Sequence, residues 1–446
     1  MQKWIKFCEY VLFIVFLIVI LFLKQKIYTL VAIPIIIGIH FLIKKVNIKN
    51  FGLFIFFFTL MIRIISIIVL KVNILDDFKT MYEASLMLLK GDLSFMNGFY
   101  FKTYPYQLGL VLYQAILLKL WKNVIVLKIM NSIYTSLIVY FIYKISKSIW
   151  KESSARMISL AYAIYLYPIY LNSVLTNQHI QSLLMMIVLY ILIKKEESIK
   201  WYSIIALLLA FSNFFRAESI IFILGIIVYN IGYLKKDNIK KKGLCVLSLL
   251  VVYFVCTTLT TVLLNNSVLF KNTDETTVDK NVTLWKFYCG LNVEHNGIYN
   301  DEDATKYFTT NEEKELLISR IKEDYKKYPI LFLKKEVILW TQTNYDLAIQ
   351  NKWNQKLRAG IENYNQGFLN VILILFVVSL FPKKKEEKKE FILLKIVIAL
   401  YFGIYLFIEI SPRYAYILHM LVFIVLAEGI EKLTEYWNLK KKEKKA

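Results

Sequence analysis

The chain has 446 residues, of which 58% are hydrophobic and 20% charged, and its formal net charge is +22. This composition is too apolar for a soluble globular protein and indicates an all-α protein that crosses a membrane several times. A net positive charge of this size also suggests a nucleic-acid partner. However, the Lys and Arg residues stand in short runs between apolar segments instead of forming one basic face, which argues against a nucleic-acid partner.

Apolar runs suited to membrane-spanning helices recur along the chain. A span needs about 20 largely apolar residues, and about twelve runs approach that length. They cover residues 7–23, 28–43, 51–70, 124–143, 154–174, 178–194, 201–215, 219–234, 244–264, 367–381, 391–408 and 413–430. The shorter stretch from Gln107 to Trp121 is expected to lie against the membrane without crossing it. Another span follows the first run at once, without a cleavage signal, so we expect a retained anchor.

Basic runs assign the two sides of the membrane. Positively charged loops favour the cytoplasm, and such loops are 44–49, 144–156, 194–200, 235–242, 383–389 and the tail 440–445. Both termini are therefore expected on the cytoplasmic side of a plasma membrane. The composition alone suggests a bacterial origin. The outer side then carries 71–106, 176–178, 265–366 and 409–413, where the polar, irregular sequence is concentrated. The Lys24–Lys26 segment is an exception, because this topology places it outside.

These runs divide the chain into four parts. An N-terminal membrane hairpin covers 1–50, and a catalytic membrane module covers 51–264, including the outer loop 71–106. An outer subdomain covers 265–366, and 367–446 holds the last spans and the basic tail. Within the outer segments, Tyr82, Ala84 and Leu88 have helical spacing. The charged stretch from Glu312 to Tyr328 also predicts a surface helix.

The acidic pair Asp76 and Asp77 is the strongest candidate for chemistry, because it stands beside a membrane span on the outer side. A carboxylate there can take a proton as a general base. The alternative is that both residues cap a helix that begins near Phe78. The pair also offers two oxygen ligands for a divalent ion bound with a phosphate, so metal dependence stays open. The four Cys and four His residues have no metal-ligand spacing, and we assign none of them to a metal.

Basic residues at the outer ends of spans are candidate phosphate ligands. Arg is costly near a membrane and suits bidentate phosphate contacts, which points to Arg216 and Arg413. The alternatives are ion pairs of Arg216 with Glu218 and of Arg413 with Glu409. Lys102 is a third candidate, or else a lysine whose stem lies along the membrane interface. His179 is a candidate for substrate contact, or else an interfacial histidine.

Several segments together resemble a known enzyme group. They are ILDDFKTMYEASLMLLKG, YFKTYPYQLG, FFRAES, LWKFYCGLNVEHNGIYND and EISPRYAYILHM, which occur in this order between residues 51 and 430. In order and in predicted side they resemble segments of GT-C glycosyltransferases. The closest resemblance is to the broad family 39-like group, which includes protein O-mannosyltransferases and lipid A aminoarabinose transferases. A single Pro105, where the family often has a second Pro and an acidic residue, departs from its pattern.

The resemblance implies a GT-C bundle of about 12 transmembrane helices with outer loop helices. It also implies a sugar donor on a polyprenyl phosphate, and transfer by inversion to a hydroxyl of an envelope glycopolymer, glycolipid or protein. Asp77 would be the general base and Asp76 its orienting neighbour, or the reverse. Contacts to the donor phosphate would come from Lys102, Arg216 and Arg413. Contacts to the substrate would come from Tyr82, Tyr104, His179, Glu409 and Tyr414.

Two other functions fit part of the pattern. A transporter or flippase of lipid-linked saccharide needs phosphate-binding arginines but no general base, and it would favour charged residues near the bilayer midplane and internal repeats. The spans hold few such charges apart from Arg63 and Lys128, and no repeat is visible. A polysaccharide polymerase or ligase that uses a diphosphate-linked oligosaccharide stays open.

Overall fold

The computed structural model describes residues 2–23, 25–45, 48–232, 239–270, 283–308, 312–341, 355–381 and 387–443, which form helices and turns with no strand among them. The helices are α1 (Gln2–Leu21), α2 (Lys26–Lys45), α3 (Phe51–Leu70), α4 (Asp76–Leu89), η1 (Ser94–Asn97), α5 (Phe99–Thr103), η2 (Pro105–Gln107), α6 (Leu108–Leu120), α7 (Ile125–Ile149), α8 (Glu152–Ile164), α9 (Leu166–Leu171), α10 (Gln178–Lys194), α11 (Ile199–Phe215), α12 (Ser219–Gly232), α13 (Ile239–Asn265), α14 (Thr283–Gly290), α15 (Asp301–Phe308), α16 (Glu313–Asp324), η4 (Tyr325–Lys327), α17 (Tyr328–Thr341), α18 (Gln355–Leu380), α19 (Lys389–Phe407), η6 (Pro412–Ala415) and α20 (Tyr416–Glu443).

Some of these helices have the length and the apolar composition that a membrane-spanning helix needs. Within the described residues, six helices are long and apolar enough to cross one, namely α3, α7, α13, α18, α19 and α20. The bent pair α1 and α2 adds at most one span, whereas α10, α11 and α12 are apolar but shorter. The structure thus supports a helical membrane protein, and the twelve-span count stays a prediction.

The predicted span 154–174 is not one helix. It is broken at Tyr165, between the end of α8 and the start of α9. Pro168 explains the break, because proline has no N–H for the carbonyl of Ile164 and its ring collides with that carbonyl in a continuous helix. Arg63 of α3 is fully buried beside this break, and its Nη1 donates to the Ala163 carbonyl at 3.1 Å. The guanidinium therefore satisfies one of the carbonyls that the interrupted helix leaves open.

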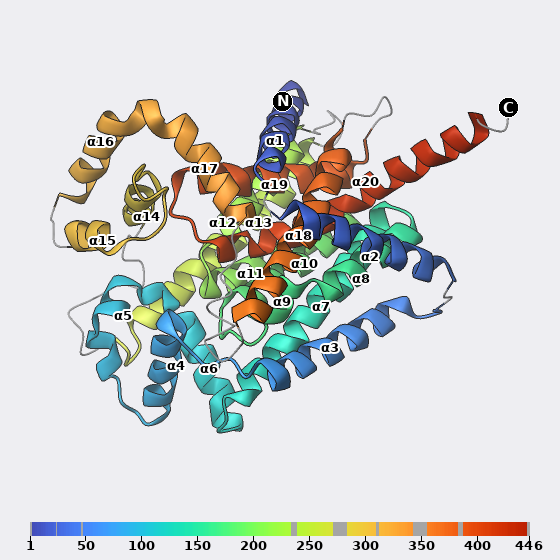
Figure 1. Cartoon of the computed structure of the whole chain (residues 1–446). Helices are drawn as coiled ribbons and strands as arrows, with labels where there is room; N and C mark the ends of the chain where they lie inside the picture. Colours follow the sequence, from blue (N-terminus) through green and yellow to red (C-terminus); the bar gives the residue numbers. More distant parts are fainter. Residues whose placement is uncertain are drawn as a thin grey trace.

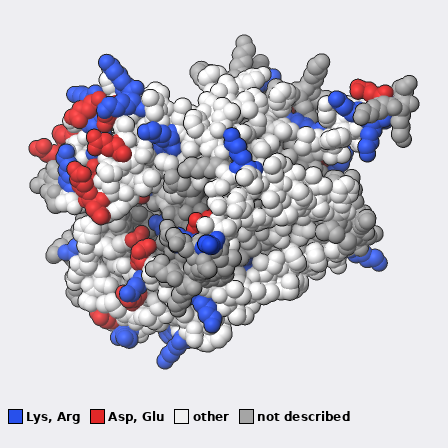
Figure 2. Space-filling model, in the orientation of Figure 1, with Lys and Arg blue, Asp and Glu red and all other residues white. Residues whose placement is uncertain are grey.

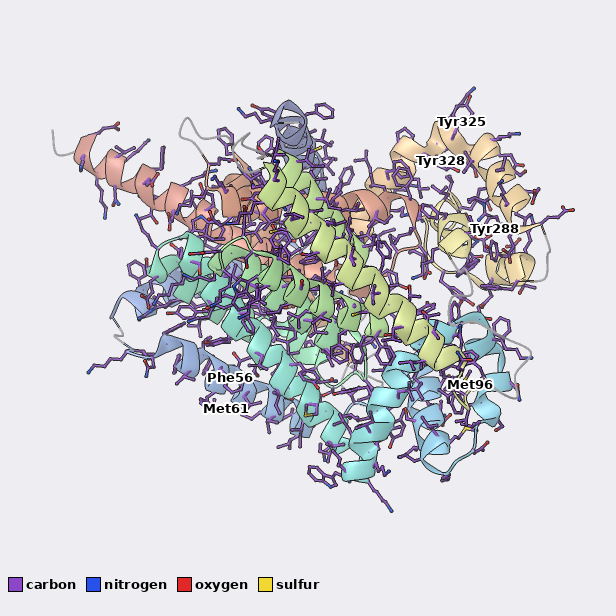
Figure 3. The ribbon with its side chains drawn as sticks, turned by 180° about the vertical axis from the view of Figure 1, so that it is seen from behind. Phe56, Met61, Met96, Tyr288, Tyr325 and Tyr328 are labelled. Atoms are coloured by element: carbon purple, nitrogen blue, oxygen red, sulfur yellow. The ribbon has the colours of Figure 1, made fainter. Side chains whose placement is uncertain are left out.

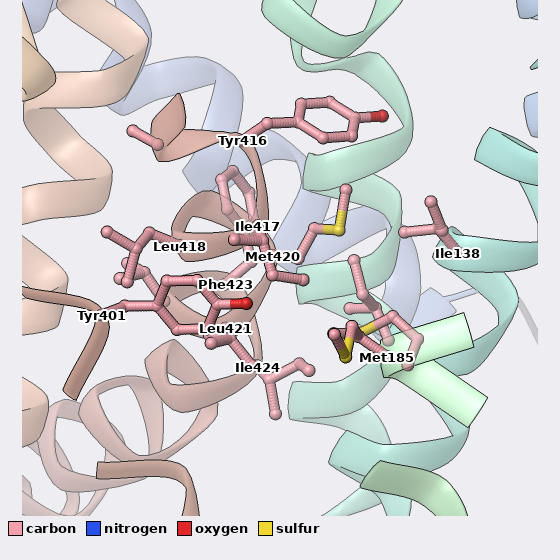
Figure 4. Close-up of a cluster of buried hydrophobic side chains, with 14 of the residues drawn as sticks. Ile138, Met185, Tyr401, Tyr416, Ile417, Leu418, Met420, Leu421, Phe423 and Ile424 are labelled. Carbon is pink, nitrogen blue, oxygen red and sulfur yellow. The ribbon is translucent and has the colours of Figure 1, made fainter. Parts of the chain in front are cut away.

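Helix α20 lies at the centre of the bundle. Its residues from Tyr416 to Ile430 are buried, and Figure 4 shows its side chains between Ile138 of α7, Met185 of α10 and Tyr401 of α19. Helices α3 and α13 lie at the periphery and carry many exposed apolar side chains. Met61 of α3, for example, projects from the edge of the molecule (Figure 3) and is 52% exposed. An apolar surface of this kind suits contact with lipid.

The predicted cytoplasmic loops meet at one end of the bundle. Arg156 donates to the Ile48 carbonyl at 3.2 Å, and the Trp150 indole donates to Glu428 at 2.8 Å. Lys242 forms an ion pair with Glu197 at 3.5 Å. Loops that the basic runs assign to one side are thus in direct contact.

The predicted outer segments gather at the opposite end, where α4 and α5 lie near α14, α15 and α16 (Figure 1). We call α14 to α16 the outer lobe. Tyr288, labelled in Figure 3, and Trp285 help to form its small core, and the Arg320 guanidinium stacks 3.6 Å from the Tyr288 ring. Helix α16 has no buried residue, which confirms the predicted surface helix. Charged side chains crowd this lobe, whereas the described part of the bundle surface on the same face carries few charges (Figure 2).

Candidate functional site

The first of the predicted outer loops places the acidic pair at the start of α4. Leu75 is the N-cap residue and makes no side-chain capping bond, so Asp76 and Asp77 lie within the first turn. The side-chain cap near Phe78 that the sequence left open is therefore not observed. Asp76 has a left-handed backbone with φ of 52°, which Asp tolerates better than most residues. The positive end of the helix dipole favours both carboxylates in this turn.

Arg413 lies opposite this turn, on η6 just before the central helix. Its Nη2 is 3.8 Å from Oδ2 of Asp77, and its guanidinium lies 5.1 Å from the centre of the Phe78 ring. The Asp77 side chain is 50% exposed and that of Arg413 is 21% exposed. The pair therefore joins the first and the last of the predicted outer segments, and its carboxylate stays half-exposed.

Two further cations surround the Tyr414 ring. The Arg216 guanidinium is 4.9 Å from the ring centre, and the Lys286 ammonium is 6.0 Å from it. Lys286 is also 6.0 Å from the centre of the Tyr106 ring. The Tyr414 hydroxyl lies 3.5 Å from Glu409. We name these residues the outer cluster: Asp77, Tyr106, Arg216, Lys286, Glu409, Arg413 and Tyr414.

Arg216 has a tight partner, as one of the two sequence interpretations expected. Its Nε donates to Oε1 of Glu218. Oε2 of Glu218 accepts a second bond from Gln181 at 3.3 Å and a third from Tyr401 at 3.4 Å. Arg216 is therefore held in place by α10 and α19 as well as by its own loop.

The segment after Lys286 packs directly against the turn that carries Glu409. The Glu409 amide donates to the Lys286 carbonyl at 2.7 Å, and the Ile410 amide donates to the Gly297 carbonyl at 2.9 Å. A Cβ on Gly290 would overlap the backbone of Ile408, so only glycine permits this approach. The segment around Lys286 and the turn around Glu409, which are far apart in the sequence, thus form one structural unit.

Burial changes the acid–base properties of the two carboxylates. Partial burial raises the pKa of Asp77, the Arg413 guanidinium lowers it, and Asp76 raises it again. Burial also raises the pKa of Glu409, against the lowering effect of Lys286 and Arg413. The pKa of Tyr106 is raised to about 12, first by burial, while Arg216 lowers it. Desolvated carboxylates next to cations are a common setting for proton transfer.

The other predicted residues lie around the cluster or away from it. Tyr104 contacts the outer lobe, with its ring 6.3 Å from that of Phe308. Lys102 is half-buried on α5, and no described carboxylate pairs with it. Tyr82 packs against the apolar core. His179 is fully buried, with Nδ1 at 3.0 Å from the Tyr416 hydroxyl and Nε2 at 2.9 Å from the Leu171 carbonyl, so neither ring nitrogen is open to a ligand.

Lys286 is the cluster residue that sequence reasoning passed over. It lies inside the quoted segment LWKFYCGLNVEHNGIYND, and the signal available was a lysine between aromatic residues in an outer loop. In the described part of the chain, no three His, Cys, Asp or Glu side chains gather as a metal site would require. A scan against protein-family models finds no match to this chain, and no curated protein matches it.

Proposed function

We propose that this protein is a membrane glycosyltransferase of GT-C type, which moves a sugar from a polyprenyl-phosphate donor to an acceptor hydroxyl on the outer face. The observation that carries the proposal is the approach of Arg413 to the Asp77 carboxylate at 3.8 Å, beside Lys286. A base and phosphate-binding cations are the two elements that this reaction needs.

The chemistry assigns a role to each side of the cluster. Asp77 takes the proton of the acceptor hydroxyl as its oxygen attacks the anomeric carbon. The bond from that carbon to the phosphate oxygen breaks, and polyprenyl phosphate leaves with the electron pair. Arg413 and Lys286 stabilise the charge that develops on the phosphate. Attack from the face opposite the leaving group inverts the anomeric configuration, and Tyr106 and Tyr414 offer aromatic faces beside the reacting groups.

The test is sugar transfer by membranes that contain the protein, supplied with radiolabelled polyprenyl-phosphate hexoses and pentoses and an envelope extract as acceptor source. Asp77→Asn should lower transfer by about 100-fold or more, the usual contribution of a general base. Glu83→Gln is a matched control, because Glu83 lies on the same helix with an exposed side chain. Transfer unchanged in Asp77→Asn, at equal protein level, would remove Asp77 as the base.

A transporter or flippase of lipid-linked saccharide is the second candidate, supported by the same basic residues beside the membrane helices. It predicts that reconstituted vesicles move labelled lipid between leaflets without new glycosidic bonds. It also predicts that Asp77→Asn leaves this movement intact while Lys286→Met slows it. A polymerase or ligase would differ in accepting a diphosphate-linked oligosaccharide in the same transfer assay.

A further inference from the structure

Lys335 on α17 is a buried lysine that the proposed chemistry does not use. Its side chain is fully buried, and its ammonium donates to three backbone carbonyls: Gly290 at 2.8 Å, Leu406 at 2.9 Å and Ile408 at 2.7 Å. The first of these carbonyls ends α14, and the other two lie at the end of α19. An ammonium group has three donors, and all three are used here.

We propose that Lys335 is a positioning residue for the outer cluster. Its ammonium ties the turn after α14 to the end of α19, and thereby sets how Lys286 faces Glu409. The inference rests on the proposed function only for its effect on catalysis. The clamp itself is a structural claim, which can be tested without a substrate.

The surroundings of the clamp support this role. Gly297, with φ of 70°, packs against the lysine stem, where a Cβ would lie 2.9 Å from Cε of Lys335 and 2.7 Å from the Gly290 carbonyl oxygen. The two amides that join the segments, those of Glu409 and Ile410, lie next to the clamped carbonyls in sequence. A buried cation is costly unless it is fully bonded, so a lysine that provided only packing would be a poor choice here.

The first test is amide hydrogen exchange in the detergent-solubilised full-length protein, with no ligand added. Lys335→Met keeps the length of the side chain but removes every donor. The Glu409 and Ile410 amides should then exchange at least about 10-fold faster, because their local opening becomes easier. Lys334→Met is the matched control, since Lys334 is the exposed neighbour on α17. Unchanged exchange in Lys335→Met would overturn the proposal.

The second test separates positioning from a general loss of fold. Lys335→Arg keeps the charge and several donors, so it should restore exchange protection at least in part. In transfer assays, Lys335→Met should raise KM for the polyprenyl-phosphate sugar, and should add little in a Lys286→Met background, because both changes disable the same contact. Additive effects would overturn the link to Lys286. If exchange responds but the wild type transfers no sugar, the clamp stands and the proposed function fails.

Discussion

The Arg413 guanidinium lies 3.8 Å from the Asp77 carboxylate, so residues near opposite ends of the chain share one site. Each charged group stabilises the other electrostatically. The cation favours the ionised form of Asp77, the form that a general base needs, and the carboxylate holds the guanidinium beside the aromatic rings. The pair also links the first outer loop to the turn before the central helix.

This pairing predicts a pH effect. Burial raises the pKa of Asp77 and Arg413 lowers it, so Arg413→Gln should raise that pKa further. A base is lost as the pH falls through its pKa. The acid limb of the pH profile of the transfer rate should therefore move to higher pH in Arg413→Gln. It should stay in place in Arg413→Lys. An unmoved limb in Arg413→Gln would show that Asp77 is not the titrating base.

Lys286 should act on donor binding as well as on the leaving phosphate, because the donor phosphate already carries negative charge before the bond breaks. A hydrogen bond to a charged group contributes about 1.5–3 kcal/mol, so Lys286→Met should raise KM for the polyprenyl-phosphate sugar by about 10- to 100-fold. Initial rates at varied donor concentration measure this change. Lys286→Arg is the control, because it keeps the charge. A loss confined to kcat in Lys286→Met would instead indicate a contact made only in the transition state.

The pKa of Lys335 predicts that sugar transfer and the contribution of this residue to stability respond oppositely to rising pH. Burial lowers the pKa of Lys335, and Glu336, Cys289 and Glu409 offset part of this effect, which leaves the pKa at about 7. Above that pH the amine has one donor fewer, so transfer should decline. The unfolded chain holds this proton up to the ordinary lysine range, so the contribution of this group to stability rises with pH.

The check is the wild-type transfer rate, together with the difference in thermal midpoint between the wild type and Lys335→Arg, from about pH 6 to about pH 9. The difference is needed because burial raises the pKa of the adjacent Glu336, whose contribution to stability falls as the pH rises. Lys335→Arg should flatten the alkaline decline, because a guanidinium stays charged. A decline that persists in Lys335→Arg would assign it to another group.

Gly290 should be intolerant of any side chain. Its Cβ would overlap the backbone at Ile408, and overpacking typically costs about 1–3 kcal/mol. Gly290→Ala should therefore lower the thermal midpoint and the transfer rate together. Gly243→Ala is the control, since no atom lies within 4 Å of that added Cβ. Equal midpoints in the two variants would contradict the close approach.

The orientation in the membrane is also testable. In a background in which the native cysteines are replaced by serine, Glu315→Cys on the outer lobe should react with an impermeant maleimide on intact cells. Lys440→Cys on the basic tail should react only after permeabilisation. Both positions are exposed. Labelling in the opposite order would reverse the assignment of sides.

The sequence predicted the helices better than the contacts between distant segments. In the described residues, most of each predicted apolar run is helical, because length and composition decide that locally, but the break at Tyr165 depends on Pro168 acting one turn away. Asp77 and Arg413 were both candidates, yet their pairing joins distant segments and no local pattern encodes it. Lys286 was missed for the same reason, because its importance comes from the turn at Glu409 that it meets only in the folded chain.

Arg63 has a consequence for how the chain enters the membrane. An arginine at the centre of a lone helix costs about 2.5–3.5 kcal/mol during insertion, and its partner, the Ala163 carbonyl, is made much later in translation. Until α8 arrives, the guanidinium on α3 lacks this carbonyl acceptor. Biogenesis should therefore retain α3 at the insertion machinery and release it together with α8, so that residues 51–164 assemble as one unit.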